Sequence, residues 1–500
     1  MGSDERAEIV FAVAADGRRS TSAAGQAVIA GALSGVDPAG AQAARGETSW
    51  RARYPVHLRR CVEAGLASRD AAVTMARGGL AALYEQLRLA RPDGTEDGLD
   101  TLVSAVPRGS LSTMTVTGAT DPERELVIPY RGERLTGDAL LRRLDAWVAG
   151  GIIEPSCAEA VRAVAAHPEW LALPGRTAVV LGAGAEVGPL SVLLSWGARI
   201  AAVDLPRAGI WERVLQVARR SAGTLLAPST LLAPAEAEQP GADLTGDVPA
   251  VAGWLAGLDG PLVLGNYVYA DGAANVRVCA AVDALTLRVQ AARPDTALAF
   301  LATPTDVFAV PASAVAQSAQ AYAERSGPSR MTGGLLHTLS GGRLLHPAYP
   351  PGADPGICDS LIPQQGPNYA LAKRVQRWRA TAARQDGTLV SLNVAPPTRT
   401  QSVTKNRILA AAYQGAPRFG VEVFEPQTTR TLMAALLVHD LNARPSGADT
   451  LPWQDEARSA AHGGLWRIAY TPRSALGLGV LLGYPGTVSR AGRGRPAPVA

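Results

Sequence analysis

Apolar residues recur at three- and four-residue spacing through the first third of the chain. The spacing is clearest over residues 56–89, 138–148 and 157–166, where it predicts amphipathic helices. Residues 112–130 interrupt these helices with a short stretch of β-type residues. We therefore expect a mostly α-helical N-terminal domain over residues 1–170.

From residue 176 onward, short apolar runs alternate with glycine-containing turns and helical segments. The apolar runs are residues 177–181, 199–203, 242–244, 261–264, 297–301 and 388–392. Buried strands that alternate with helices are typical of a parallel, doubly wound sheet, which binds ligands at the carboxyl ends of its strands. The sequence thus predicts the α/β fold class, with a Rossmann-type domain over residues 171–445 and a C-terminal extension over residues 446–500.

The alternation stops between residues 311 and 367, a segment rich in glycine and proline. It contains one helical piece at residues 312–325 and a short strand candidate at residues 343–346. A loop of this length in a compact domain usually serves as a lid or a binding loop. We expect a lid over the substrate.

The charge balance and the apolar runs exclude several classes of partner. The chain carries a formal net charge of +4 over 500 residues, and no run mixes Arg with aromatic residues as single-strand nucleic-acid binders do. No apolar run near the end could span a bilayer, and the N-terminus has no signal-peptide pattern. We expect a cytoplasmic protein that acts on a small molecule, without nucleic acid or membrane, and leave a homo-oligomer open.

Cysteine and histidine residues show no metal-binding spacing. The four cysteines are scattered, which suits a reducing cytoplasm better than a disulfide framework, and they are Cys61, Cys157, Cys279 and Cys358. Residues of the insertion leave open an acid–base or nucleophilic role, although no recognised spacing links them; they are His337, His346, Cys358 and Asp359.

One of the two lysines of the chain lies four residues after a tyrosine. Lys and Arg together number 48, and Lys373 and Lys405 are the only lysines among them. On a helix, Tyr369 and Lys373 lie one turn apart on the same face, so the ammonium group can lower the pKa of the phenol. A phenol of this kind can act as an acid or a base in catalysis.

A glycine-rich turn follows the first predicted strand of the sheet. Gly182, Gly184 and Gly188 stand between this strand and a helix, and Asp204 ends the second strand. Glycines let the backbone approach a pyrophosphate, and a helix N-terminus supplies free N–H groups. The carboxylate can accept hydrogen bonds from ribose hydroxyls and repels a 2′-phosphate. The turn therefore predicts a dinucleotide site that favours NAD, while Arg207 keeps NADP open.

The order of the later segments resembles the short-chain dehydrogenase/reductase family. Asp243 and Leu244 resemble its motif after the third strand, where the Asp contacts adenine. Asn266 stands where the family has its Asn-Asn-Ala-Gly turn, and Thr400 ends a segment like the one after its sixth strand. The resemblance covers about residues 175–440, and it implies that these four residues help to bind NAD or NADP.

The same resemblance implies roles at the reacting centre. The Tyr369 hydroxyl would give or take the proton at a carbonyl or alcohol oxygen, and Lys373 would bind the nicotinamide ribose and lower the tyrosine pKa. A serine normally orients the substrate oxygen. The candidates here are Thr303 and Thr305 at the strand end, of which we prefer Thr303 on strand geometry, and Ser360 in the insertion. The implied activity is NAD(P)-dependent hydride transfer at a carbonyl or alcohol, or at a related C=C or C=N bond. The Leu, Pro and Tyr residues of the insertion would suit a fairly bulky small-molecule substrate.

Two departures from the family pattern keep other functions open. Glu186 replaces a glycine of the phosphate turn, and no suitable serine lies about a dozen residues before Tyr369. One alternative is therefore a non-catalytic α/β scaffold or binding protein. The other is an S-adenosylmethionine-dependent methyltransferase, because the first two strands, with Gly182, Gly184 and Asp204, also resemble that family.

Overall fold

The computed structural model describes residues 7–14, 16–106, 109–230, 239–443 and 450–492. Within these residues the main sheet has eight strands in the order β10-β9-β8-β7-β11-β12-β15, with β4 paired to β9. The strands are β4 (Ser112–Thr117), β7 (Thr177–Leu181), β8 (Arg199–Val203), β9 (Thr224–Thr230), β10 (Gln239–Pro240), β11 (Leu262–Asn266), β12 (Ala297–Ala302) and β15 (Val390–Val394).

Apart from β4, the chain first enters this sheet in the middle, at β7. It moves outward through β8 and β9, and then returns to build β11, β12 and β15 on the other side of β7. These strands are parallel to their neighbours, whereas β4 and β10 run antiparallel to β9. This is the doubly wound Rossmann order, so the predicted fold class is confirmed.

The third strand of the sheet is not the one expected from the sequence. β9 occupies this position, and residues 242–244 form no strand, so the prediction there was wrong. β9 contains Pro228, which has no N–H to donate and therefore argues against a strand in the sequence. Asp243 and Leu244 nevertheless follow the third strand along the chain.

Alternating strand residues build a separate core on each face. In β7, Val179 and Leu181 belong to one core, and Ala178 and Val180 to the other. The first face is covered by α10 (Val248–Ala256), α11 (Ala273–Ala292) and α14 (Gly366–Gln385), and the second by α8 (Leu190–Ser195), α9 (Ala208–Arg219) and α17 (Pro426–Asn442).

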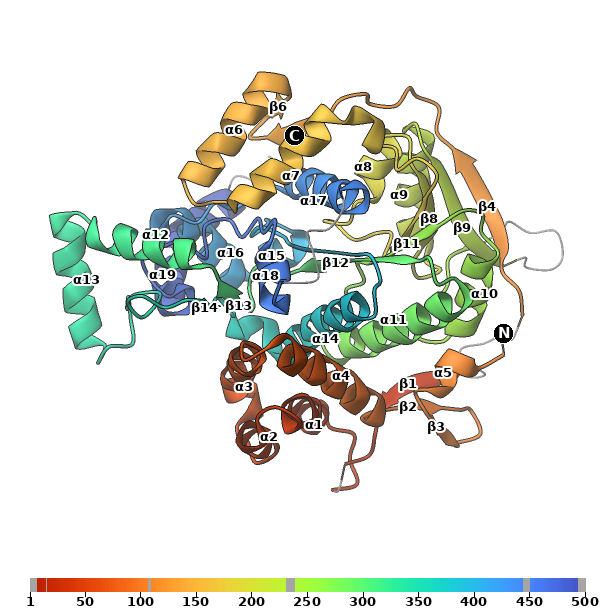
Figure 1. Ribbon diagram of the computed structural model, residues 1–500, viewed down its shortest axis with the longest axis horizontal. Coiled ribbons are helices and arrows are strands. Elements are labelled where there is room, and N and C mark those ends of the chain that lie inside the picture. The colour runs from red at the N-terminus through yellow and green to blue at the C-terminus, as the bar shows by residue number, and fades with distance from the viewer. Residues whose placement is uncertain (1–6, 15, 107–108, 231–238, 444–449, 493–500) are drawn as a thin grey trace, which may run out of the picture.

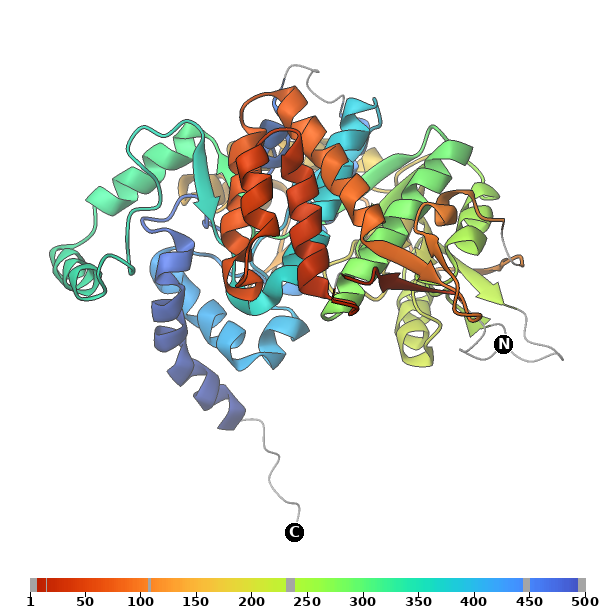
Figure 2. The same ribbon diagram turned by 90° about the horizontal axis from the view of Figure 1, so that it is seen from below.

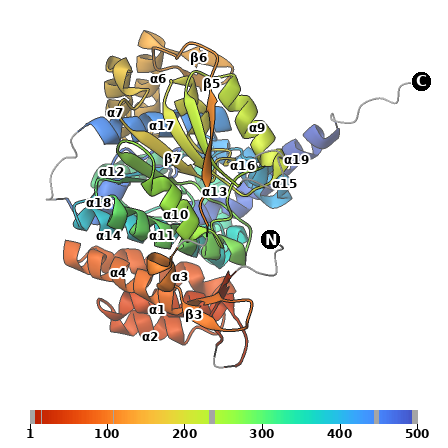
Figure 3. The same cartoon turned by 90° about the vertical axis from the view of Figure 1, so that its right-hand side faces the viewer.

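The described elements before residue 170 lie on both faces of this sandwich (Figures 1 and 3). A helical layer packs outside α14 and consists of α1 (Thr21–Ser34), α2 (Pro38–Arg45), α3 (Trp50–Gly65) and α4 (Arg69–Glu85). β4 joins the main sheet, and on the opposite side α6 (Gly137–Ala149) and α7 (Pro155–Ala166) lie over α17. Smaller elements complete the region: β1 (Glu8–Phe11), β2 (Leu87–Ala90), β3 (Glu96–Gly98), α5 (Thr101–Ser104), β5 (Ile128–Tyr130) and β6 (Glu133–Leu135).

A glycine contact attaches the helical layer to α14. A Cβ on Gly79 of α4 would collide with the ring of Trp378, so the indole lies directly on the α4 backbone. Figure 2 shows α1–α4 in front of the sheet when the molecule is seen from below. The N-terminal layer thus supports the helix that carries Tyr369 and Lys373.

The predicted insertion leaves the sheet after β12. Between its predicted bounds, residues 311 and 367, it contains α12 (Ala312–Ala323), α13 (Gly327–Leu339) and β14 (Gly356–Asp359). β14 pairs with β13 (Val307–Val310), which precedes the insertion. The strand expected at residues 343–346 is absent from this described segment, because Leu345 has a left-handed φ of 53° that an extended strand does not allow.

The remaining helices lie near the end of the chain. α15 (Gln401–Lys405) and α16 (Arg407–Gly415) follow β15, and α18 (Pro452–Ala457) and α19 (Pro472–Gly492) follow α17. α19 packs along α16 and extends away from the body of the molecule (Figure 2). Among the described helices, none is both long and apolar enough to cross a membrane.

Candidate functional site

The parallel strands end at one edge of the sheet, and α14 brings Tyr369 and Lys373 to this edge. α14 begins at Gly366, whose φ of 81° turns the chain into the helix. The Lys373 Nζ donates to the carbonyl oxygen of Leu301 in β12 at 3.2 Å, and to Gln376 Oε1 at 3.2 Å. The predicted pair therefore lies where a Rossmann sheet binds its ligands.

Gln376 extends this contact to the neighbouring strand. Its Nε2 donates to Asn266 Oδ1, at the end of β11, over 3.3 Å. Both side chains are buried. Asn266 is thus brought to Lys373 through Gln376, a residue that the sequence analysis missed. Its position three residues after Lys373 and seven after Tyr369, on the same helix face, is the signal that could have identified it.

Thr303 is the hydroxyl partner that the structure brings to Tyr369. It directly follows β12, and its hydrogen bond to the Tyr369 hydroxyl lowers the phenol pKa. The chain of hydroxyls continues from Thr303 Oγ1 to Thr305 Oγ1 at 2.9 Å, and from there to Gln365 Oε1 at 2.8 Å.

Ser360, the other candidate, has a different place. Its hydroxyl contacts the carbonyl oxygens of Pro304 and Asp306 at 2.7 and 2.8 Å, and the side chain is buried. These contacts hold the loop after β12 in position. Ser360 therefore supports the loop that carries Thr303, while Thr303 itself meets the phenol.

Burial dominates the proton affinities of the pair. It raises the pKa of Tyr369 above the usual value, against the opposing hydrogen bond from Thr303. It also lowers the pKa of Lys373, while Cys279 and Asp306 act in the opposite direction. The lowering of the phenol pKa expected from the sequence is therefore reversed, because desolvation disfavours the phenolate.

The glycine turn follows β7 as predicted. Gly182 has a φ of 86°, and a Cβ there would lie 2.9 Å from the carbonyl oxygen of Tyr267, so only glycine fits. The Gly184 amide donates to Asp204 Oδ2 at 2.8 Å, and the Leu205 amide donates to Asp204 Oδ1 at 2.8 Å. Asp204 thus holds the turn with both oxygens, each of which keeps a lone pair.

Most amides of the turn are used within the protein. The amides of residues 182 and 183 donate to the Val203 carbonyl, that of residue 185 to the Gly182 carbonyl, and that of Gly188 to the Ala185 carbonyl. The helix that follows, α8, has only six residues. The turn consequently offers fewer free donors to a pyrophosphate than the sequence suggested.

Glu186 is a further obstacle to a pyrophosphate at this turn. Its Oε2 accepts a hydrogen bond from the Gln401 amide at 2.7 Å, at the start of α15. The carboxylate therefore connects the glycine turn to the segment after β15. Thr400, the preceding residue and a predicted cofactor ligand, pairs its hydroxyl with Ser402 at 2.9 Å.

The adenine-side candidates lie beyond β9. Asp243 Oδ1 accepts from the Thr245 amide at 2.9 Å and from its hydroxyl at 2.7 Å, so it shapes its own turn. Leu244 is buried in the core. The residues present fit a dinucleotide at its two ends, near Asp204 and near Lys373, and fit it poorly at the diphosphate because of Glu186.

The titratable residues of the insertion make contacts that hold the scaffold together. Cys358 is buried, and burial raises its thiol pKa to about 12. Asp359 pairs with Arg473 at 2.9 Å, and His337 Nδ1 lies 2.9 Å from the Leu344 carbonyl oxygen. Across the described residues, no group of three or more His, Cys, Asp or Glu side chains is placed to hold a metal ion.

A buried ion network on the far side of α14 was also missed. Asp306 Oδ1 accepts from Arg374 at 2.8 Å, and its Oδ2 accepts from Arg377 at 2.7 Å. Arg377 continues to Glu456 of α18. The network therefore holds the loop with Thr303 and Thr305 against the helix with Tyr369. The two arginines lie three residues apart, but Asp306 is 68 residues from Arg374, and Glu456 is 79 residues from Arg377, so no local pattern could reveal the network.

Three solved structures resemble parts of this chain. An oxidoreductase of the short-chain dehydrogenase/reductase family from Burkholderia thailandensis has 14% identity and a TM-score of 0.31, over 58% of this chain and 92% of its own. A short-chain dehydrogenase/reductase from Serratia marcescens has 17% identity and a TM-score of 0.30, over 59% and 99%. A C2-type ketoreductase from a modular polyketide synthase has 17% identity and a TM-score of 0.28, over 53% and 47%.

No protein-family model matches the sequence, and no curated protein matches it either. The strand order of the sheet is therefore what assigns the Rossmann fold to this chain.

Proposed function

We propose that the protein is an NAD(P)-dependent oxidoreductase that reduces a carbonyl group or oxidises the matching alcohol. The observation that carries the proposal is the meeting of Tyr369, Lys373 and Thr303 at the carboxyl edge of a Rossmann sheet. Reactive groups gathered at this edge are typical of active sites in such folds.

The raised pKa of Tyr369 suits a proton donor. At neutral pH the phenol is protonated, so it can donate a hydrogen bond to a carbonyl oxygen and pass its proton to that oxygen as the alcohol forms. Thr303 can orient the same oxygen through its hydroxyl. The phenolate then recovers a proton from water, which balances the step.

A nicotinamide, when bound, supplies or accepts the hydride at the carbonyl carbon. Lys373 is held between β12 and Gln376, where its ammonium group can meet ribose hydroxyls. Asp204 can accept from the adenosine ribose with its remaining lone pairs, and its charge disfavours a 2′-phosphate. NAD is therefore the favoured cofactor.

Calorimetry with NADH, NADPH and S-adenosylmethionine tests the proposal. We expect NADH to bind and to raise the melting temperature, with a stabilisation of about 2.7 kcal/mol at 100 times its Kd. The same enzyme should consume NADH when a ketone is added. Binding of S-adenosylmethionine alone would instead support a methyltransferase, and no binding at all would support a scaffold.

Glu186→Gln should bind NADH about tenfold more tightly than the wild type. The change keeps the side-chain shape and the acceptor for the Gln401 amide, but it removes a negative charge from the turn that would meet the diphosphate. Two like charges a few ångströms apart repel by about 1–4 kcal/mol near a protein surface. Calorimetric Kd values for NADH and for ADP measure the effect.

A matched control removes the same negative charge from a different element of the protein. Glu212→Gln removes an exposed carboxylate from α9 and should leave the Kd of ADP unchanged. Adenosine has no phosphate, so its affinity should be the same for both variants and the wild type. An unchanged ADP affinity in Glu186→Gln would show that Glu186 does not oppose the diphosphate.

A further inference from the structure

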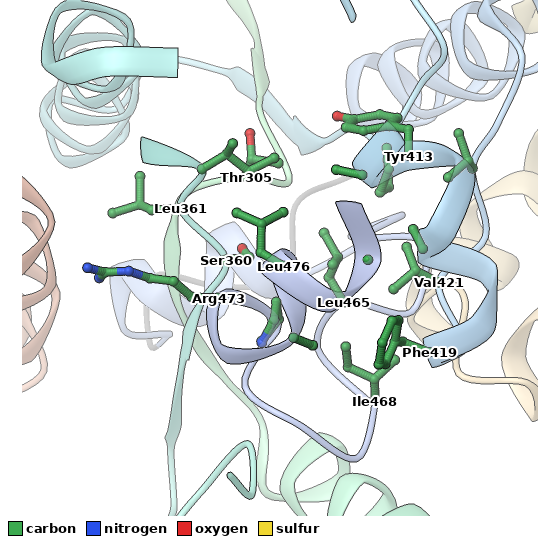
Figure 4. A pocket seen from close by; sticks show the side chains of 18 residues that line it. Thr305, Ser360, Leu361, Tyr413, Phe419, Val421, Leu465, Ile468, Arg473 and Leu476 are labelled. Atoms are coloured by element: carbon green, nitrogen blue, oxygen red, sulfur yellow. The ribbon is translucent and has the colours of Figure 1, made fainter. Parts of the chain in front are cut away.

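A cavity of about 80 Å³ lies beside the loop that follows β12. Figure 4 shows that its walls come from the end of β14, from α16 and the turn after it, from the segment before α19, and from α19 itself. Most of the lining is apolar, and its larger aliphatic members are Leu361, Ile362, Val421, Leu465, Ile468 and Leu476.

The cavity is polar at one end, where Thr305, the hydrogen-bond partner of Thr303, forms part of the lining. Thr305 and Tyr413 lie at the same end in Figure 4, and the aliphatic side chains lie beyond them. The Thr305 hydroxyl pairs with Thr303, the partner of Tyr369. Burial, with Tyr369 nearby, raises the pKa of Tyr413, so its hydroxyl stays protonated and can donate to an oxygen.

The remaining polar residues of the cavity lining offer no unpaired charge to a ligand. Ser360 already contacts two backbone carbonyls. Of the described residues that line the cavity, Arg473 alone is charged, and Asp359 neutralises it at 2.9 Å. A ligand in this cavity therefore gains most from uncharged, apolar atoms with one oxygen at the Thr305 end.

We propose that the cavity binds an alkyl group of about three or four carbons that belongs to an uncharged ketone or secondary alcohol. The size follows from comparison with an apolar cavity of roughly 150 Å³, which accommodates benzene. The oxygen lies at the Thr305 end, beside Tyr369. The alkyl site stands on the cavity alone, while the reaction at the oxygen rests on the proposed oxidoreductase function.

α19 forms one wall and permits a matched test. It packs so closely on α16 that a Cβ on Gly415 of α16 or on Gly483 of α19 would collide with the backbone of the facing helix. Gly479 lines the cavity, and a Cβ there would meet only Ala412 O at 3.8 Å and Phe419 Cε2 at 4.0 Å. Gly477 faces open space on the same helix.

The experiment compares Gly479→Leu with Gly477→Leu in the full chain. The probes are 2-propanol, 2-butanol, 2-pentanol and 2-hexanol, whose Kd values are measured by NMR titration without cofactor. In the wild type and in Gly477→Leu, each added methylene should tighten binding about fourfold until the cavity is full. In Gly479→Leu, the leucine fills the cavity and this gain should disappear.

Leu476→Ala makes the opposite change to the cavity. It keeps the proposal testable if the filled variant Gly479→Leu does not fold. It enlarges the cavity, so the gain per methylene should continue to longer alcohols than in the wild type. Equal affinities across the alcohol series in the wild type, or an unaltered series in both cavity variants, would overturn the proposal. If the Kd depends on the chain length of the alcohol but the protein does not consume NADH when a ketone is added, the alkyl site is supported and the oxidoreductase function is rejected.

Discussion

Tyr369→Phe should lower kcat/KM for ketone reduction by about 100- to 10,000-fold, which is the usual contribution of a general acid. The phenyl ring keeps the packing of the partly buried tyrosine, including its edge contact with Tyr269 at 6.2 Å between ring centroids. The proton that should reach the substrate oxygen is lost. Steady-state kinetics measures the loss, and the melting temperature should remain within a few degrees of the wild type.

Tyr269→Phe is the matched control for this prediction. Tyr269 lies next to Tyr369 but is exposed, and its hydroxyl donates to Asp271 at 2.9 Å. Its replacement should leave kcat/KM within about twofold. NADH should bind all three proteins equally, because neither hydroxyl holds the cofactor in the proposed site. Turnover of Tyr369→Phe at the wild-type rate would exclude the phenol as the acid.

Asp306→Asn should destabilise the protein by about 3–5 kcal/mol, because it leaves the buried Arg374 without its paired carboxylate and Arg377 with Glu456 alone. Asp306 is 1% exposed and bonds Arg374 and Arg377 through different oxygens. The loop with Thr303 and Thr305 depends on this contact. Urea unfolding followed by fluorescence measures the change.

Asp386→Asn tests whether burial causes the effect. Asp386 also pairs with an arginine, Arg77, at 2.6 Å, but both side chains are more than half exposed, at 57% and 56%. Exposed pairs contribute about 1 kcal/mol or less. Equal destabilisation by the two variants would mean that the buried network contributes nothing beyond an ordinary surface pair.

The contribution of Asp306 to the stability of the protein should also depend on pH. Burial would raise its pKa, but the charges of Arg374 and Arg377 outweigh this and lower the pKa below its usual value. A carboxyl with a lowered folded-state pKa contributes its stability above the unfolded pKa, near about 3.9. The difference in the free energy of unfolding between wild type and Asp306→Asn should therefore be full at neutral pH and shrink as the pH falls below about 4.

Two helices with a clear apolar stripe were predicted from the sequence, and one without a stripe was missed. α6 and α7 match the predicted segments at 138–148 and 157–166 closely. α1 was not predicted, because its sequence is apolar or small at nearly every position and therefore has no stripe. Burial against α2, α3 and α4 stabilises it, and this depends on contacts that a local pattern does not contain.

In the candidate site, too, some features could be identified from the sequence and others could not. Tyr369, Lys373 and the glycine turn could be identified because each depends on neighbours within one turn of helix or one strand end. The partners of Thr305 and Gln376 could not be identified, because the contacts join residues 60 and 110 positions apart.

By itself, the sequence determined the alternation of strands and helices, and with it the Rossmann class, and it marked Tyr369 with Lys373 as a pair on one helix face. The tertiary structure alone decided that Thr303 meets the phenol, that Glu186 crosses to α15, and that burial raises the Tyr369 pKa. The reason is physical: periodicity and spacing are local properties of the chain. Desolvation and charge pairing are set by whatever the fold places nearby.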